Sequence, residues 1–163
     1  MLKVVERSDK DNGYFYENII QANTIISLDT VNMDNYKPLL VVPKSEFLVG
    51  MSKNLNFFDE VITLEDLEKR IIEANLQEKV PTVNSYIGLS NAYKAYKPFL
   101  YLNIGPDKRD KKIVQQLKLV NPNTGKEIFL SELESSYPND QGVWYPLYNS
   151  LIDYLRRTSK SYK

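Results

Sequence analysis

The stretch from Ile113 to Leu130, IVQQLKLVNPNTGKEIFL, predicts a β-hairpin and decides the fold class. Apolar and β-branched residues run through Ile113–Val120 and return in Lys126–Leu130, as they do in paired strands. Between the two runs, Pro122-Asn123-Thr124-Gly125 provides turn-forming residues, with a glycine that can adopt a positive φ. We therefore expect an antiparallel hairpin over about residues 113–130.

Three segments upstream of the hairpin also have the composition of strands. Thr24–Leu28 is rich in β-branched residues, and Leu39–Val42 is an apolar run closed by a proline, as in a strand buried inside a sheet. Phe99–Ile104 is another apolar strand, which Gly105-Pro106 is expected to end. Residues 106–112 are then predicted to form a charged loop that leads into the hairpin.

Two segments have the periodicity of main helices. Thr63-Leu64-Glu65-Asp66 matches an N-terminal capping pattern, and apolar residues follow at helical spacing, which predicts a helix over about 63–77. A second helix is predicted over about 146–157, with Pro146 in its first turn. Arg156 and Arg157 lie at its C-terminal end, where positive charge suits the helix dipole.

Two shorter helical segments complete the expected elements. One helix is expected to begin at a Ser90 cap and to end before Pro98, and a single helical turn is expected at Ser131–Glu134. Strands thus cluster early and late in the chain, without a repeating βαβ order. We predict a single α+β domain over residues 1–163, with a mixed, largely antiparallel sheet.

Two absences in the composition exclude most enzyme classes. The 163 residues include no cysteine and no histidine, so thiolate nucleophiles, zinc ribbons, imidazole bases and Ser-His-Asp triads are all excluded. The six glycines are isolated, so no phosphate-binding loop is present, and we see no catalytic constellation. We expect a non-enzymatic protein without a cofactor or a metal site.

The first ten residues lack the apolar region of a secretory signal, and no apolar run approaches the roughly 18 residues of a membrane span. We therefore expect a cytoplasmic protein with no membrane partner, or a virion-associated one if a phage encodes it.

Charge is unevenly distributed along the chain. Residues 80–93 carry no charged side chain, whereas residues 94–126 carry eight basic and two acidic ones. The basic region also contains tyrosines, and cations with stacking rings are typical of nucleic-acid surfaces. The alternative is a solvated loop. The candidate contacts to nucleic acid or to an acidic partner are Lys94, Lys97, Lys108, Arg109, Lys111 and Lys112.

An aromatic cluster precedes the last predicted helix. Trp144, Tyr145 and Tyr148 are candidate interface residues, because tryptophan and tyrosine are the residues that most often anchor protein interfaces. The alternative is that these rings attach the last helix to the core.

The missing catalytic residue types favour a non-catalytic protein that binds another protein or copies of itself. The composition favours Lys, Asn, Tyr and Ile, whose codons are AT-rich, which suggests a low-GC genome. A phage or prokaryotic virion-assembly component is therefore the first hypothesis. An immunity or anti-defence inhibitor is an alternative. A nucleic-acid-binding module that uses the basic loop 108–112 is another, and a carboxylate-based, metal-dependent hydrolase is the third class considered.

Overall fold

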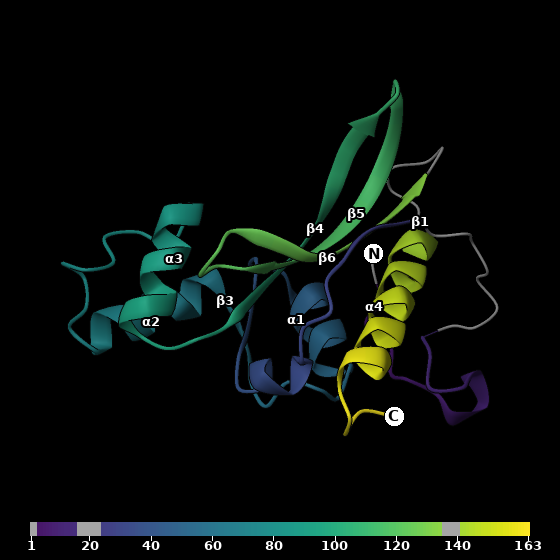
Figure 1. Ribbon diagram of the computed structural model, residues 1–163, viewed down its shortest axis with the longest axis horizontal. Coiled ribbons are helices and arrows are strands. Elements are labelled where there is room, and N and C mark those ends of the chain that lie inside the picture. Colours follow the sequence, from purple (N-terminus) through teal and green to yellow (C-terminus); the bar gives the residue numbers. More distant parts are fainter. Residues whose placement is uncertain (1–2, 16–23, 135–140) are drawn as a thin grey trace.

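The computed structural model describes residues 3–15, 24–134 and 141–163, which form a six-stranded sheet with helices on both faces (Figure 1). The strands lie in the order β1-β6-β5-β4-β2-β3. Their bounds are Thr24–Leu28 (β1), Leu40–Val42 (β2), Val61–Thr63 (β3), Leu100–Arg109 (β4), Lys112–Asn121 (β5) and Lys126–Glu134 (β6). The α-helices of the described residues are Glu46–Lys53 (α1), Leu64–Glu73 (α2), Tyr86–Ala95 (α3) and Trp144–Thr158 (α4). Short 3-10 helices lie at Asp9–Asp11, Met33–Tyr36 and Gln141–Val143.

The strand pairing confirms the predicted α+β class with a mixed, largely antiparallel sheet. β1, β6, β5 and β4 pair antiparallel, while β2 lies parallel to both β3 and β4. The predicted hairpin is β5 and β6, and it is longer than expected. Ser131–Glu134 belong to β6 and do not form the predicted helical turn, because β5 pairs with all four residues and β1 with the first two.

β4 is also longer than predicted. It passes through Gly105-Pro106 to Arg109, and the predicted loop 106–112 is the end of a second hairpin, β4–β5. Asp110 and Lys111 form its two-residue turn with φ values of 50° and 67°, as a type I′ turn requires. Gly105-Pro106 does not stop the strand, because a proline is tolerated where its missing N–H would face away from the neighbouring strand.

Local capping explains where the helices begin. Thr63 and Asp66 form the predicted capping box at the start of α2, and α4 begins two residues before Pro146. α3 begins at Tyr86 with Ser85 as its cap, so the prediction of a cap at Ser90 was wrong. None of the helices in the described part of the chain has the length and apolar character that a bilayer crossing requires.

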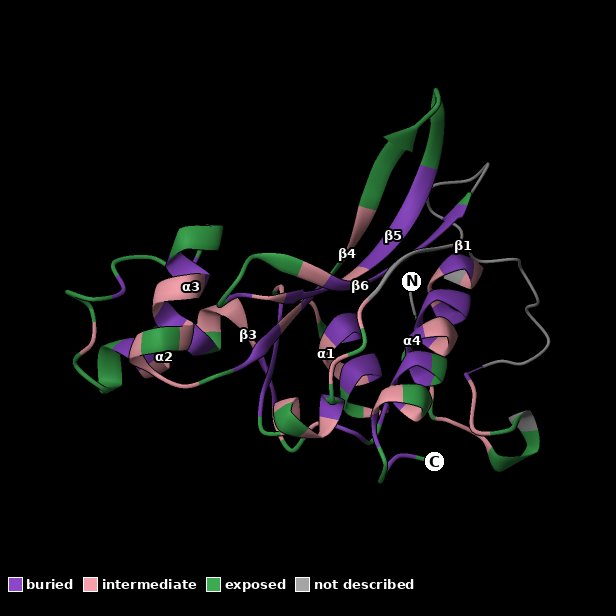
Figure 2. Ribbon diagram, viewed as in Figure 1, coloured by how far each residue is buried: buried purple, intermediate pink, exposed green. Residues whose placement is uncertain are grey.

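Two cores lie on opposite faces of the sheet, because successive residues of β2 point to opposite sides. Leu40 joins a large core beneath α1 and α4, and Val41 joins a small core beneath α2 and α3. Burial follows this division (Figure 2): the inner side of α4 is buried, whereas the outer half of the β4–β5 hairpin is exposed. On the face of the small core, α2 and α3 therefore lie over only the β3 end of the sheet.

Candidate protein-binding surface

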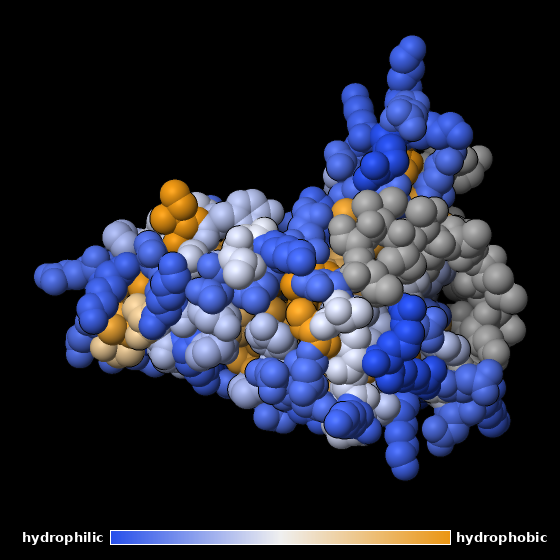
Figure 3. Space-filling view, viewed as in Figure 1, coloured by the Kyte–Doolittle hydropathy of each residue, from blue (hydrophilic) through white to orange (hydrophobic). Residues whose placement is uncertain are grey.

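Residues 80–93, which include most of α3, carry no charged side chain. The chain as a whole is 26% charged, so fourteen consecutive residues without a charge stand out. Within them Tyr86 and Ile87 are 61% and 77% exposed. Figure 3 shows hydrophobic atoms projecting from the part of the molecule that α3 occupies. Large apolar side chains are exposed there side by side, which is typical of a contact surface.

A cavity of about 280 Å³ is lined in part by Tyr86. It is bounded by the start of α2, the loop before α3, α3 itself and β4. Its lining residues are Leu64, Val83, Asn84, Ser85, Tyr86, Leu89, Tyr101 and Asn103. The cavity thus combines apolar walls with a few neutral polar groups, as small binding pockets generally do.

Close packing of α3 on the preceding loop shapes this cavity. Ser85 caps α3 by accepting a hydrogen bond from the Gly88 amide at 3.0 Å. A Cβ at residue 88 would lie 2.1 Å from the Thr82 carbonyl oxygen, so only glycine permits this approach. On the sheet side, burial and the neighbouring Tyr86 raise the pKa of Tyr101, so its phenol stays protonated as a hydrogen-bond donor.

The edge of β4 continues from the cavity toward the hairpin tip. β2 pairs with Leu100 and Tyr101 only, and beyond them no described strand pairs with this edge. Pro43 follows β2 directly and has no N–H, so β2 cannot extend the ladder. We define the α3–β4 surface as Tyr86, Ile87, the cavity lining and the β4 edge from Ile104 to Lys108.

The structure places the predicted aromatic cluster mainly in the large core. Tyr148 is fully buried, its hydroxyl lies 3.0 Å from Ser52 Oγ, and burial raises the pKa of its phenol. Tyr145 is 4% exposed and donates to the Lys3 carbonyl at 2.6 Å. Trp144 is half-buried against the same core. This placement corresponds to the alternative in which the rings attach the last helix, so Tyr145 and Tyr148 are not available to a partner.

The six candidate cations do not form one patch. Lys94 lies on α3, and Lys97 lies just beyond it, 3.9 Å from Glu60. Lys108, Arg109, Lys111 and Lys112 lie at the tip of the β4–β5 hairpin, roughly 30 Å along β4 from its start (Figure 1). The extended β4 also separates Tyr93 and Tyr96 from the hairpin cations.

Acidic partners further reduce the positive charge of the hairpin tip. Arg109 Nε lies 2.7 Å from the buried Glu132, whose other oxygen accepts from Gln116 at 3.1 Å. Lys112 lies 3.4 Å from Glu134. Lys108 and Lys111 are exposed and form no ion pair with the described residues. The tip therefore presents two free cations, flanked by Asp107 and Asp110.

A larger cavity, of about 810 Å³, lies at the C-terminal end of α4. Two of its charged lining groups are engaged within the chain, since Asp29 contacts Lys126 at 2.8 Å and Arg156 donates to the Asn12 carbonyl at 2.7 Å. Arg157 and Lys160 also line it and form no ion pair with the described residues. No group of three or more metal-ligating side chains occurs among residues 3–15, 24–134 and 141–163. The α3–β4 surface is therefore the better candidate site.

Sequence reasoning did not single out Tyr86, Ile87 or the β4 edge. The signal was the uncharged stretch 80–93, but charge alone does not tell a buried segment from an exposed one. Val83, Leu89 and Ala92 of the same stretch are buried in the small core. Only the fold separates these residues from the exposed pair.

Comparison with known proteins gives structural likenesses at low similarity. No protein-family model matches the chain, and no curated protein matches it in sequence. Thirteen chains of solved structures match it. The C-terminal domain of LpoB from Salmonella enterica has a TM-score of 0.41 and 11% identity over 68% of this chain and 88% of that one. The same domain from Escherichia coli has a TM-score of 0.39 and 13% identity over 67% and 87% of the two chains. The PelC dodecamer from Paraburkholderia phytofirmans has a TM-score of 0.36 and 11% identity over 82% and 97%. At these values the likenesses carry no argument about function, which rests on the surface described above.

Proposed function

We propose that this chain is a non-catalytic protein that acts by binding another protein through the α3–β4 surface. The observation that carries the proposal is the pair Tyr86 and Ile87, 61% and 77% exposed within an uncharged stretch, with Tyr86 lining a cavity. Exposed aromatic and aliphatic side chains next to a pocket are the usual anchors of protein interfaces. Their burial against a partner would provide the main hydrophobic contribution.

The charge distribution favours a protein partner over a nucleic acid. Residues 80–93 contribute no cation to the surface, whereas phosphate binding depends on clustered cations. The hairpin tip has lysines, but Arg109 and Lys112 contact carboxylates of β6. Assembly of a larger particle and inhibition of a target protein are two uses of such a surface, and the identity of the partner distinguishes them.

Site-directed photo-crosslinking tests this proposal. A benzophenone amino acid replaces Ile87 and, as a matched control, Ile72, which is 50% exposed on α2 and lies outside the α3–β4 surface. We expect a crosslinked product of defined mass from position 87 in cells of the native host, and none from position 72. Tyr86→Asp should abolish that product.

Two outcomes of the crosslinking would contradict the proposal. One is the absence of a product from position 87, and the other is an identical pattern from positions 87 and 72. A product at twice the mass of the chain would identify a second copy as the partner.

A further inference from the structure

We infer that the partner binds as an added β-strand along the free edge of β4, through an extended segment that has an apolar residue at one end and an acidic residue at the other. This inference rests on the proposed function and names the chemistry of the partner. Addition of a strand to an open sheet edge uses main-chain hydrogen bonds for affinity and side-chain pockets for specificity.

The hairpin register shows which backbone groups face the free edge. In a two-residue hairpin the residues that close the turn, here Arg109 and Lys112, exchange both hydrogen bonds. Odd-numbered residues of β4 therefore bond to β5, and even-numbered ones face the other way. The Leu100 amide confirms this parity, since it donates to the Leu39 carbonyl at 3.3 Å on the β2 side. Beyond β2, the outward groups belong to Ile104, Pro106 and Lys108.

Two of these outward residues are typical of protected edges. Pro106 removes one donor, and Lys108 places a charge on the strand, both of which hinder indiscriminate edge pairing. The carbonyls of Ile104, Pro106 and Lys108 and the amide of Ile104 can still bond to a fitting strand. The amide of Lys108 donates to Asp107 Oδ1 at 2.8 Å, so an added strand would have to replace this bond. An added strand must not place a carbonyl that needs a donor opposite Pro106, because Pro106 has no N–H. Pro106 therefore also sets the register of the added strand.

A second copy of this chain fits the edge poorly. Two-fold antiparallel pairing centred on Pro106 would oppose two residues that lack an N–H. Pairing centred on Gly105 or on Asp107 would place each Pro106 opposite Ile104 or Lys108, so one hydrogen bond of each such pair is lost. Pairing centred on Lys108 would oppose two ammonium groups, which is destabilising. We therefore assign the edge to a segment of a different protein.

The faces of β4 define the side chains of the occupant, because directly opposed residues share a face. Asn103 lines the cavity beside α3, so the residue opposite Asn103 should be apolar and enter that cavity. Gly105 has no atom within 4 Å of a Cβ position, so a large side chain fits opposite it. Lys108 is exposed and forms no ion pair with the described residues, so an acidic residue fits opposite it.

Peptide selection on the whole chain, followed by hydrogen exchange, tests this inference. A displayed library of random 12-residue peptides is selected on the immobilised protein, and the consensus peptide is then added to the labelled protein in solution. We expect alternating apolar residues with an acidic residue toward one end. On binding, exchange of the Ile104 amide should slow by about tenfold or more. The amides of Asn103 and Asp107 already bond to β5, so their exchange should change little.

A matched pair of charge reversals tests whether an acidic residue of the partner lies opposite Lys108. Lys108→Glu should weaken peptide binding by about threefold or more, because the opposed charges become alike. Lys160→Glu, on an exposed lysine beyond α4, should leave affinity unchanged.

Three results would overturn the inference. One is that no peptide is selected. Another is that a selected peptide binds without slowing exchange at Ile104. This result leaves the proposed function intact, because the crosslinking at position 87 tests it separately. The third is slowed exchange at this amide in the free protein that rises with its own concentration, which would assign the edge to a second copy.

Discussion

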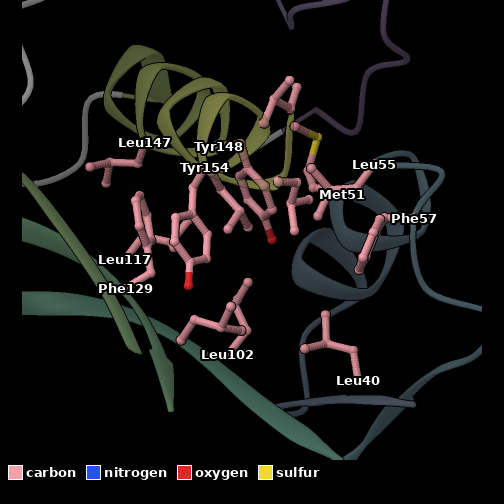
Figure 4. Close-up of a cluster of buried hydrophobic side chains, with 14 of the residues drawn as sticks. Leu40, Met51, Leu55, Phe57, Leu102, Leu117, Phe129, Leu147, Tyr148 and Tyr154 are labelled. Carbon is pink, nitrogen blue, oxygen red and sulfur yellow. The ribbon is translucent and has the colours of Figure 1, made fainter. Parts of the chain in front are cut away.

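α3 and α4 both carry tyrosines, and the two helices use them in opposite ways. Tyr148 and Tyr154 of α4 are fully buried between α1 and the sheet (Figure 4), whereas Tyr86 of α3 is 61% exposed. α4 packs across the large core, where helices and strands surround its inner side. The first turn of α3 lies at the margin of the small core. Aromatic content therefore does not identify an interface by itself, because the position of a helix in the fold decides which rings are exposed.

Removal of one tyrosine ring from each helix should give the largest difference in the free energy of unfolding. Tyr148→Ala should lower the free energy of unfolding by about 3–5 kcal/mol, because it leaves a large cavity in the core. Tyr86→Ala should change it by no more than about 0.5 kcal/mol, since the ring is mostly in solvent. Urea denaturation followed by circular dichroism measures both values. Equal losses in the two variants would remove the distinction between the helices.

Alkaline pH should lower the stability of the protein through its buried tyrosines. Burial raises the pKa of Tyr154 and of Tyr162 to about 12, above the ordinary tyrosine value of 10.0. The unfolded chain therefore loses these protons first, and stability should fall as the pH rises from about 10 toward 12. The melting temperature over this interval measures the effect, and Tyr154→Phe should make the decline shallower. A melting temperature that is constant above pH 10 would contradict the assignment.

The smallest effect on stability should come from the proposed contact residue. Ile87→Asp should change the melting temperature by no more than about 2 °C, because the side chain is 77% exposed. Binding of the selected peptide or of the crosslinked partner should nevertheless be lost. Calorimetry with the same preparation measures both properties. A large loss of stability would show that Ile87 belongs to the small core.

Elements with strong local signals could be predicted from the sequence. The turn at Pro122–Gly125 predicted β5–β6, and the capping box at Thr63 predicted α2. α1 was not predicted, because it has only eight residues and an internal glycine, Gly50. These elements depend on hydrogen bonds between near neighbours, which are readable in sequence when the capping and turn residues are distinctive.

The candidate site could not be predicted, because its parts meet only in the tertiary structure. The cavity joins Leu64, Tyr86 and Tyr101, which come from three separate elements. The β4 edge is open because β2 ends at Val42, a pairing between distant parts of the chain. A Gly-Pro pair would end a strand that is bonded on both sides. β4 continues through Gly105-Pro106 because β2 no longer pairs with it there, so the proline faces an open edge.

The short pairing of β2 with β4 also has a consequence for folding kinetics. β4, β5 and β6 are joined by tight turns and can form early, whereas α1, β3, α2 and α3 separate β2 from β4 along the chain. Until β2 docks, the entire outer edge of β4 is open, including the part that α2 and α3 later flank. A chaperone or the partner itself could shield that edge during synthesis. Folding and binding then use the same strand edge in sequence, with β2 taking the first two positions and the partner taking the rest.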